Sequence, residues 1–321
     1  MRETTIRIEQ SVVVSTEPSR LWPLLSSPAV WSLWPDSAFV FAVPEVQTLR
    51  FFIGPIRRGT GAVLFEVCDE VPGSMIRLRT LPTGRQEYTL SVAAARRGTA
   101  KATVRVTEMV PRFRSIDFEV KRRSDIKSWL SAMRAVTEGR ARWPGTGMPA
   151  RLRKACMAQP RIIIAQSASA SALISADPAT VWDAVHSPES ARFLGTSPPI
   201  YSGYVPGTPQ GQAGEMQYFI DRRADGPFTG QVVVVTETAD QRSALACRLG
   251  LFQFEQHYQL TPESESGPTR LNLTFRWATP ETTDAAKTAA TQMAESVQAV
   301  ASGYKSLIET GDGRASAATE P

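Results

Sequence analysis

The chain contains little histidine and little cysteine, with two and three of these residues among 321. Cys68, Cys156 and Cys247 are far apart and form no Cys-x-x-Cys pair, so neither a disulfide framework nor a zinc site is indicated. His186 and His257 are too few for a histidine-rich metal site or for a Ser-His-Asp arrangement in each half. We therefore expect buried, reduced thiols, and neither a metal nor another cofactor.

Long apolar runs are also absent. No stretch approaches the roughly 20 apolar residues that a membrane helix needs. The first ten residues, MRETTIRIEQ, lack the apolar core and the cleavage site of a secretion signal. We expect no membrane span and a cytoplasmic protein.

Positive charge is concentrated in the first half of the chain. Residues 1–150 carry 22 Lys and Arg against 14 Asp and Glu, whereas the rest carries 14 against 17. The basic residues are scattered, without the aromatic or glycine pattern of nucleic-acid-binding modules. We interpret them as a solvated face and expect no nucleic-acid partner.

The chain contains an internal repeat. STEPSRLWPLLSSP (15–28) and SADPATVWDAVHSP (175–188) share the pattern S-x-x-P-x-x-x-W-x-x-x-x-S-P. Further landmarks recur at offsets of 167 to 170, as one fold written twice requires. They pair Phe52-Ile53 with Phe219-Ile220, Thr60-Gly61 with Thr229-Gly230, Arg79 with Arg248, and Tyr88 with Tyr258.

Length and repeat together predict two domains. We place the first at residues 1–140, a Pro/Gly/Arg-rich linker at 141–160, the second domain at 161–310, and a disordered tail at 311–321.

The second copy shows the order of elements most clearly. A strand-like run ends before Asp177-Pro178, where Ser175 or Asp177 can cap a short helix that Pro188 terminates. Alternating runs then predict antiparallel strands at 215–222, 230–237, 244–254, 255–260 and 270–277. A long amphipathic helix follows, with a cap at Thr279 and Pro280 just inside it. The first copy ends with a similar helix, so we expect an α+β fold in both.

This order, with SADPATVWDAV directly after the first strand, resembles the helix-grip fold of the START-related SRPBCC superfamily. The resemblance implies, in each domain, a curved antiparallel sheet wrapped round a long C-terminal helix, with a deep and mainly apolar cavity between them. Two tandem copies also resemble the didomain polyketide aromatase/cyclases of bacteria.

The resemblance implies that in those enzymes a strand with the pattern W-x-S-x-R places a serine and an arginine on the cavity wall. The matching strand of the second copy ends at Arg222, which shares a strand face with Met216, Tyr218 and Ile220. If that face points inward, Arg222 is the candidate catalytic residue, because a fixed cation stabilises developing negative charge. Ile220 stands where the serine is expected, and Arg222 can equally be a solvated strand-end residue.

Aromatic and methionine side chains are the candidates for lining a ligand cavity, with plain core packing as the alternative. The candidate ligand-binding residues are Trp31, Trp34, Phe39, Trp129, Met133, Tyr201, Tyr204, Met216, Tyr218, Phe252, Trp277, Met293 and Tyr304. We expect Arg79 and Arg248 to face water and neither histidine to serve as a general base, although a well-placed histidine could.

Three functions remain open. The first is binding of a hydrophobic small molecule, an aromatic polyketide or a lipid-like compound. The second is a polyketide aromatase/cyclase that catalyses an intramolecular aldol cyclisation and dehydration, and the third is a protein-interaction or co-chaperone-like module. The Gly/Pro-rich stretch YSGYVPGTPQGQAGE (201–215) favours the second copy as the working pocket. The ligand, the orientation of the domains and the oligomeric state are left open.

Overall fold

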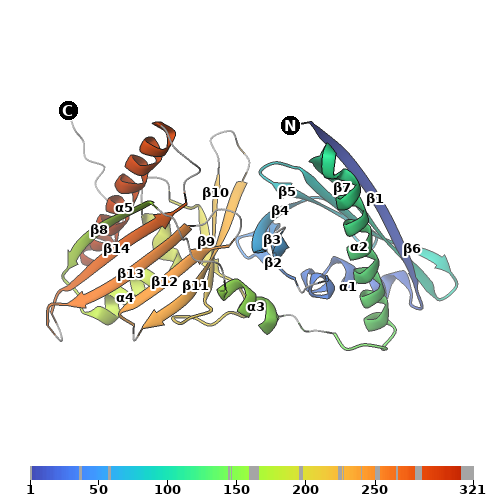
Figure 1. The fold of residues 1–321 in the computed structure, drawn as a ribbon. Coiled ribbons are helices and arrows are strands. Elements are labelled where there is room, and N and C mark those ends of the chain that lie inside the picture. The colour runs from blue at the N-terminus through green and yellow to red at the C-terminus, as the bar shows by residue number, and fades with distance from the viewer. Residues whose placement is uncertain are drawn as a thin grey trace. The chain divides into compact units, whose positions relative to one another are not determined.

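The computed structural model describes residues 2–35, 38–56, 59–143, 145, 147–158, 166–194, 198–222, 226, 228–239, 241–249, 254–264, 267–278 and 284–311. The chain divides into two compact units. Unit 1 is Met1–Arg58 with Ala62–Leu152, and unit 2 is Gly59–Gly61 with Arg153–Pro321. Each contains a seven-stranded sheet and a long C-terminal helix, α2 or α5 (Figure 1). This confirms the predicted α+β class and the tandem helix-grip architecture.

Unit 1 forms one antiparallel sheet with the strand order β1-β7-β6-β5-β4-β3-β2. Its elements are β1 (Glu3–Val14), α1 (Pro18–Ser26), η1 (Pro28–Leu33), β2 (Phe39–Val43), β3 (Val46–Ile56), β4 (Gly59–Val71), β5 (Met75–Leu81), β6 (Gln86–Arg96), β7 (Thr99–Pro111), η2 (Arg112–Arg114) and α2 (Ser115–Thr137). The chain continues into α3 (Ala150–Met157).

Unit 2 repeats this topology with the strand order β8-β14-β13-β12-β11-β10-β9. Its elements are β8 (Gln166–Ile174), α4 (Pro178–His186), η3 (Pro188–Phe193), β9 (Tyr201–Tyr204), β10 (Met216–Arg222), β11 (Phe228–Ala239), β12 (Ser243–Arg248), β13 (Phe254–Pro262), β14 (Thr269–Trp277) and α5 (Asp284–Thr310). The first and last strands along the chain, β8 and β14, pair directly.

The short helix α4 begins and ends where the sequence predicts. Asp177 is its N-cap, and the carboxylate accepts hydrogen bonds from the backbone N–H groups of Ala179 and Thr180, each at 3.0 Å. Pro178 takes the first turn, where its missing N–H costs nothing. The helix ends at His186, before Ser187-Pro188.

A carboxylate fastens the C-terminal end of the long helix in each unit to the turn after the first strand. Glu138 accepts a hydrogen bond from the backbone N–H of Ser15 at 3.1 Å, and Glu309 accepts one from Ser175 at 2.7 Å. Arg134 and Arg140 also donate to Glu138. The two Ser–Glu contacts therefore mark equivalent positions in the two units.

The sequence did not predict every element, and two examples lie near the domain linker and the expected pocket entrance. Tyr201–Tyr204, assigned to an entrance loop, forms the edge strand β9, and Ala150–Met157 forms a helix within the predicted linker. The predicted cap at Thr279 and Pro280 and the tail from 312 onward lie outside the described residues.

Two features are absent from the described residues, a membrane-spanning helix and a metal-binding cluster. These residues contain no helix long and apolar enough to cross a membrane. They also contain no group of three or more His, Cys, Asp or Glu that could hold a metal ion.

We predict that Glu138→Gln destabilises the protein at neutral pH. The N–H of Ser15, with Arg140 and Arg134, lowers the pKa of Glu138 from 4.5 to about 2. A carboxyl group whose pKa is lower in the folded than in the unfolded state stabilises the protein at pH values above its unfolded-state pKa. This stabilisation is lost as the pH falls through the folded-state pKa. Denaturant titrations should therefore show a difference between wild type and variant at pH 7 that shrinks between pH 4.5 and about 2.

The control is Glu9→Gln, because Glu9 forms an exposed pair with Arg105 and exposed pairs contribute little. A wild-type-to-variant difference for Glu138→Gln that stayed constant over this pH range would contradict a role for the carboxylate charge.

Candidate ligand cavity

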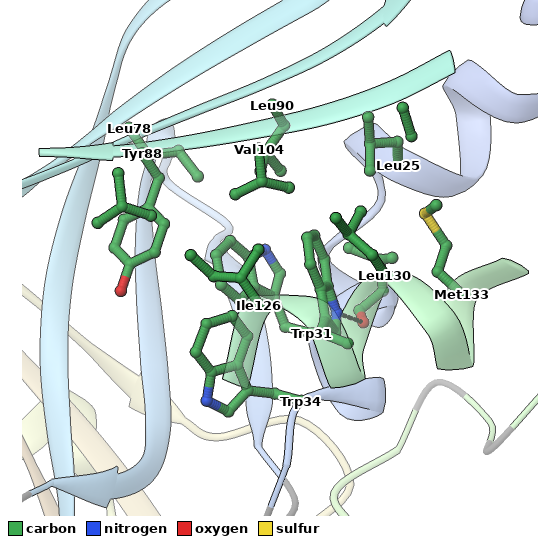
Figure 2. Packing of buried hydrophobic residues seen from close by; sticks show 14 of the residues in the cluster. Leu25, Trp31, Trp34, Leu78, Tyr88, Leu90, Val104, Ile126, Leu130 and Met133 are labelled. Atoms are coloured by element: carbon green, nitrogen blue, oxygen red, sulfur yellow. Dashed lines mark hydrogen bonds between the residues drawn. The ribbon is translucent and has the colours of Figure 1, made fainter. Parts of the chain in front are cut away.

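The space between helix and sheet in unit 1 is filled by a tryptophan cluster. Trp31 stacks on Trp129 with ring centroids 5.3 Å apart, and Trp34 lies 5.6 Å from Trp31 and 5.9 Å from Trp129. All three are buried, and the indole N–H of Trp129 donates to the backbone oxygen of Val30 at 2.8 Å. Figure 2 shows Trp31 and Trp34 between the sheet and α2.

Other large side chains complete this packing. Tyr88 meets the Trp31 ring edge-on, with centroids 5.4 Å apart, and Phe52 does so at 5.9 Å. Leu78 and Met133 are buried in the same cluster (Figure 2). Four of the five predicted ligand-binding residues of unit 1 therefore lie in a packed core, and the fifth, Phe39, lies outside it. Trp31, Trp34, Trp129 and Met133 belong to the core, whereas Phe39 stacks with Phe41 on the other face of β2.

Unit 2 instead holds a cavity of about 510 Å³ between its sheet and α5, of a size typical for small-molecule sites. Most of its wall is aliphatic and aromatic. The lining residues are Val185, His186, Ser187, Ala191, Leu194, Pro199, Gln217, Phe219, Asp221, Gln231, Val233, Val235, Ala244, Ala246, Arg248, Phe254, Gln256, Tyr258, Phe275, Trp277, Met293, Ser296, Val300 and Tyr304.

The strand registers show why one unit is full and the other hollow. Val14 pairs with Ala100 in unit 1, and the equivalent Ile174 pairs with Thr269 in unit 2. Counting from these pairs across the ladders places small or polar residues of unit 2 at positions that carry large ones in unit 1. The equivalent pairs are Ile76 and Ala244, Leu78 and Ala246, and Tyr88 and Gln256.

The helices show the same replacement. With Glu138 equivalent to Glu309, Trp129 corresponds to Val300. With Ser27-Pro28 equivalent to Ser187-Pro188, Trp31 corresponds to Ala191 and Trp34 to Leu194. All of these unit 2 residues line the cavity. Smaller side chains at fixed backbone positions therefore create the space.

Two charged side chains of opposite sign lie on the cavity wall. Burial lowers the pKa of Arg248, and the negative charge of Asp221 opposes that shift. Burial raises the pKa of Asp221, and Arg248 opposes it in turn. Each residue is therefore partly desolvated and is acted on by the other's charge.

His186 also lines the cavity, at the C-terminal end of α4. Its ring stacks on Trp182 with centroids 3.7 Å apart, and Nδ1 lies 3.2 Å from the backbone oxygen of Trp182. Because a carbonyl oxygen only accepts, Nδ1 is the protonated nitrogen, and in the neutral ring Nε2 carries a lone pair. Burial lowers the pKa of His186, which favours this neutral form.

The peptide group of His186 is held as well as its ring. Its backbone oxygen accepts hydrogen bonds from Tyr204 Oη at 3.1 Å and from Gln217 Nε2 at 2.7 Å. Strands β9 and β10 thus fix the end of α4 from which the imidazole projects.

Trp277 has a buried indole N–H without an acceptor among the described residues. The side chain is 5% exposed and lines the cavity. Its ladder partner Gln166 likewise has a buried Oε1 without a hydrogen bond. Unpaired buried polar groups are costly, so this donor would gain from an added acceptor.

Three predicted ligand-binding residues of unit 2 line the cavity, namely Trp277, Met293 and Tyr304. Tyr204 instead donates a hydrogen bond to the backbone oxygen of His186 at the end of α4. Tyr201 packs near Phe228, with ring centroids 6.5 Å apart. Phe252 lies outside the described residues.

The condition under which Arg222 would be catalytic, an inward face shared with Met216 and Tyr218, is not met. Gln217, Phe219 and Asp221 line the cavity, so Met216, Tyr218 and Arg222 belong to the opposite face because side chains alternate. Tyr218 covers Gly203 of β9, where an added Cβ would lie 2.6 Å from its Oη. Arg222 is exposed, donates to the backbone oxygen of Gly226 at 3.3 Å, and does not line the cavity.

Three ionisable residues of the cavity, Asp221, Arg248 and His186, were not among the predicted site residues. Arg248 was expected to face water together with its sequence match, Arg79, because their neighbours of like parity, Arg77 and Ala246, form no apolar face. Arg79 does so, in an exposed pair with Glu66. The ladders instead make Thr80, which is buried, the equivalent of Arg248. Letting the repeat shift by one residue at this strand would have placed Arg248 inward.

We predict that equal truncations cost less in unit 2 than in unit 1. Leu78→Ala in the filled core should lower the free energy of unfolding by about 2–5 kcal/mol, as is typical for such sites. Leu194→Ala should cost less, because this side chain already borders open space. Denaturant unfolding of the two variants beside wild type measures this, and a larger loss for Leu194→Ala would contradict the difference in packing.

No protein-family model matches the chain, and no curated protein matches it. The chain is similar to solved structures of di-domain ARO/CYC proteins. BexL, from the BE-7585A biosynthetic pathway, is 16% identical over 100% of both chains with a TM-score of 0.34. StfQ, from the steffimycin biosynthetic pathway, is 9% identical over 96% of this chain and 94% of its own, with a TM-score of 0.33. The Zhui aromatase/cyclase from Streptomyces sp. R1128 is 16% identical over 44% of this chain and 99% of its own, with a TM-score of 0.37. Such similarities concern the fold alone.

Proposed function

We propose that the protein binds an apolar small molecule in the cavity of unit 2. The observation that carries this proposal is the set of replacements at equivalent positions, where Ala191, Ala244, Ala246 and Val300 stand for bulky residues of unit 1. An apolar cavity of this size costs packing energy, because the side chains around it lose contacts. A bound ligand restores those contacts and gives the cavity a function.

The wall suits a flat ligand with a few polar groups. Phe254 meets Phe275 edge-on with centroids 5.3 Å apart, and Met293 adapts its shape to what it contacts. Gln217, Gln231 and Gln256 add amide groups to an otherwise apolar surface. This combination of an apolar wall and few polar groups is typical of small-molecule sites. We do not extend the proposal to unit 1, because its tryptophan cluster occupies the corresponding space.

Ala246→Leu tests the proposal by installing the residue that unit 1 carries at this position. The leucine should fill the cavity as Leu78 fills unit 1, so the affinity for a neutral apolar dye such as Nile red should fall at least tenfold. The unfolding free energy should change little. Fluorescence titration measures the affinity, and Ala95→Leu, an exposed position in unit 1, is the matched control.

Mass spectrometry of solvent extracts from protein purified from its native host provides an independent test. A stoichiometric apolar compound in wild type that is missing from Ala246→Leu would support the proposal. Unchanged dye affinity in that variant would contradict it.

A second candidate function, that of a polyketide aromatase/cyclase, is favoured by the presence of His186 and Arg248 among the residues that line one cavity. In this proposal Nε2 of His186 takes a proton from a carbon flanked by carbonyl groups, and Arg248 stabilises the enolate oxygen. The enolate carbon attacks a second carbonyl of the same chain, and the imidazolium returns the proton to the new alkoxide. Loss of water then completes the dehydration.

His186→Gln tests this second function. We expect turnover of a short poly-β-ketone thioester to fall by about 10²–10⁴, as for loss of a general base, while affinity for a non-reactive ligand is kept. Since the pKa of His186 is lowered, wild-type turnover should decline only below the ordinary value of 6.5 as the base becomes protonated. Equal turnover in both proteins would remove His186 from the mechanism and leave ligand binding standing.

A further inference from the structure

We infer that Asp221 and Arg248 act as a charge-neutral pair that makes the unit 2 cavity select neutral, carbonyl-bearing ligands over carboxylates. This inference rests on the proposed ligand-binding function and specifies the chemical class of the ligand.

The charges on the lining residues balance. Among them, Arg248 is the one Lys or Arg and Asp221 the one Asp or Glu. His186 is held neutral by its burial and by the carbonyl contact at Nδ1. Tyr258 and Tyr304 stay protonated, because burial raises the pKa of both. The wall thus presents one cation and one anion.

The two charges lie on strands β10 and β12 of one sheet, which flank β11. Arg248 is opposite Val233 of β11, and Asp221 on β10 is opposite Thr229 of the same strand. In the described part of the chain, neither side chain has a hydrogen bond or an ion pair within 4 Å. Their polar atoms are therefore available to a ligand, and each still acts on the other through its charge.

An anionic ligand gains little from this arrangement. A carboxylate that contacts Arg248 is also repelled by the negative charge of Asp221, which reduces the net attraction. The cost of removing the carboxylate from water remains, and it is far larger than that of a carbonyl. A neutral carbonyl accepts a hydrogen bond from the guanidinium without this repulsion. Asp221 therefore excludes anions that Arg248 alone would attract.

The indole of Trp277 supports a carbonyl as the preferred group. Trp277 lines the same cavity, and its buried indole N–H, which can only donate, has no acceptor among the described residues. Trp277 pairs with Phe254, the residue before Glu255, and Glu255 pairs with Cys247 beside Arg248. The two donors thus lie near the same end of the sheet, where ligand acceptors satisfy both.

The test uses two probes with one aromatic body, 2-acetylnaphthalene and 2-naphthoate. Calorimetric titration of the full chain at pH 7.5 should show that wild type prefers the ketone by at least tenfold. Asp221→Asn should raise the affinity for naphthoate about tenfold and change that for the ketone less than threefold. Asp221→Glu, which keeps the charge, should keep the wild-type preference.

The controls distinguish a failure of the proposed ligand selectivity from a failure of ligand binding itself. Glu263→Gln removes a carboxylate that pairs with exposed Arg270 outside the cavity, and should behave like wild type. If wild type binds both probes equally and Asp221→Asn shifts neither, the inference is overturned while ligand binding stands. If folded wild type binds neither probe and no neutral dye, both are overturned.

Discussion

The distance between helix and sheet is the constraint on which the rest of the structure depends. In each unit a glutamate at the end of the long helix holds the N–H after the first strand, and the ladders run in the same order. Backbone geometry thus defines nearly the same space twice. Because protein interiors tolerate few voids, side-chain size at facing positions decides whether that space is core or cavity. Indoles in unit 1 and methyl groups in unit 2 lead to opposite outcomes.

This division separates stability from recognition. Unit 1 buries its aromatic rings against one another, and its interior charge pair, Arg122 with Glu108, is closed by direct contact at 3.0 Å. Unit 2 leaves Arg248, Asp221 and the indole N–H of Trp277 without protein partners in the described residues. Folding alone does not favour such groups on an apolar wall, since each loses water without gaining a partner. Deviations of this kind are expected at functional sites.

Local sequence patterns predicted the fold well, whereas the strand register determines which side chains face the cavity. Capping by Asp177, termination before Pro188 and alternation along strands follow from nearby residues, so they are legible in one sequence. Which face of a strand points inward depends on bulges, such as those between Val67 and Asp69 and between Val235 and Glu237. A slip of one residue reverses every side chain. Matching Arg79 to Arg248 by identity contained such a slip. Of the two positions considered for Arg222, the exposed one at the strand end is observed, because the other face of β10 lines the cavity. Tyr88 and Tyr258, matched by identity, are two ladder positions apart.

The arginine on the cavity wall is therefore Arg248 of β12 and not the candidate Arg222, and Asp221 acts on it through its charge. This charge changes what the cation can do. An isolated arginine on an apolar wall would bind ground-state anions, whereas one balanced by Asp221 leaves the resting cavity neutral overall. Such a wall suits a neutral ligand on which negative charge develops only during proton transfer to a neutral base such as His186. If the proposed cyclase function holds, the pair would stabilise the transition state more than the bound substrate, and such a difference accelerates a reaction. Ligand selection and catalysis would thus depend on the same two side chains.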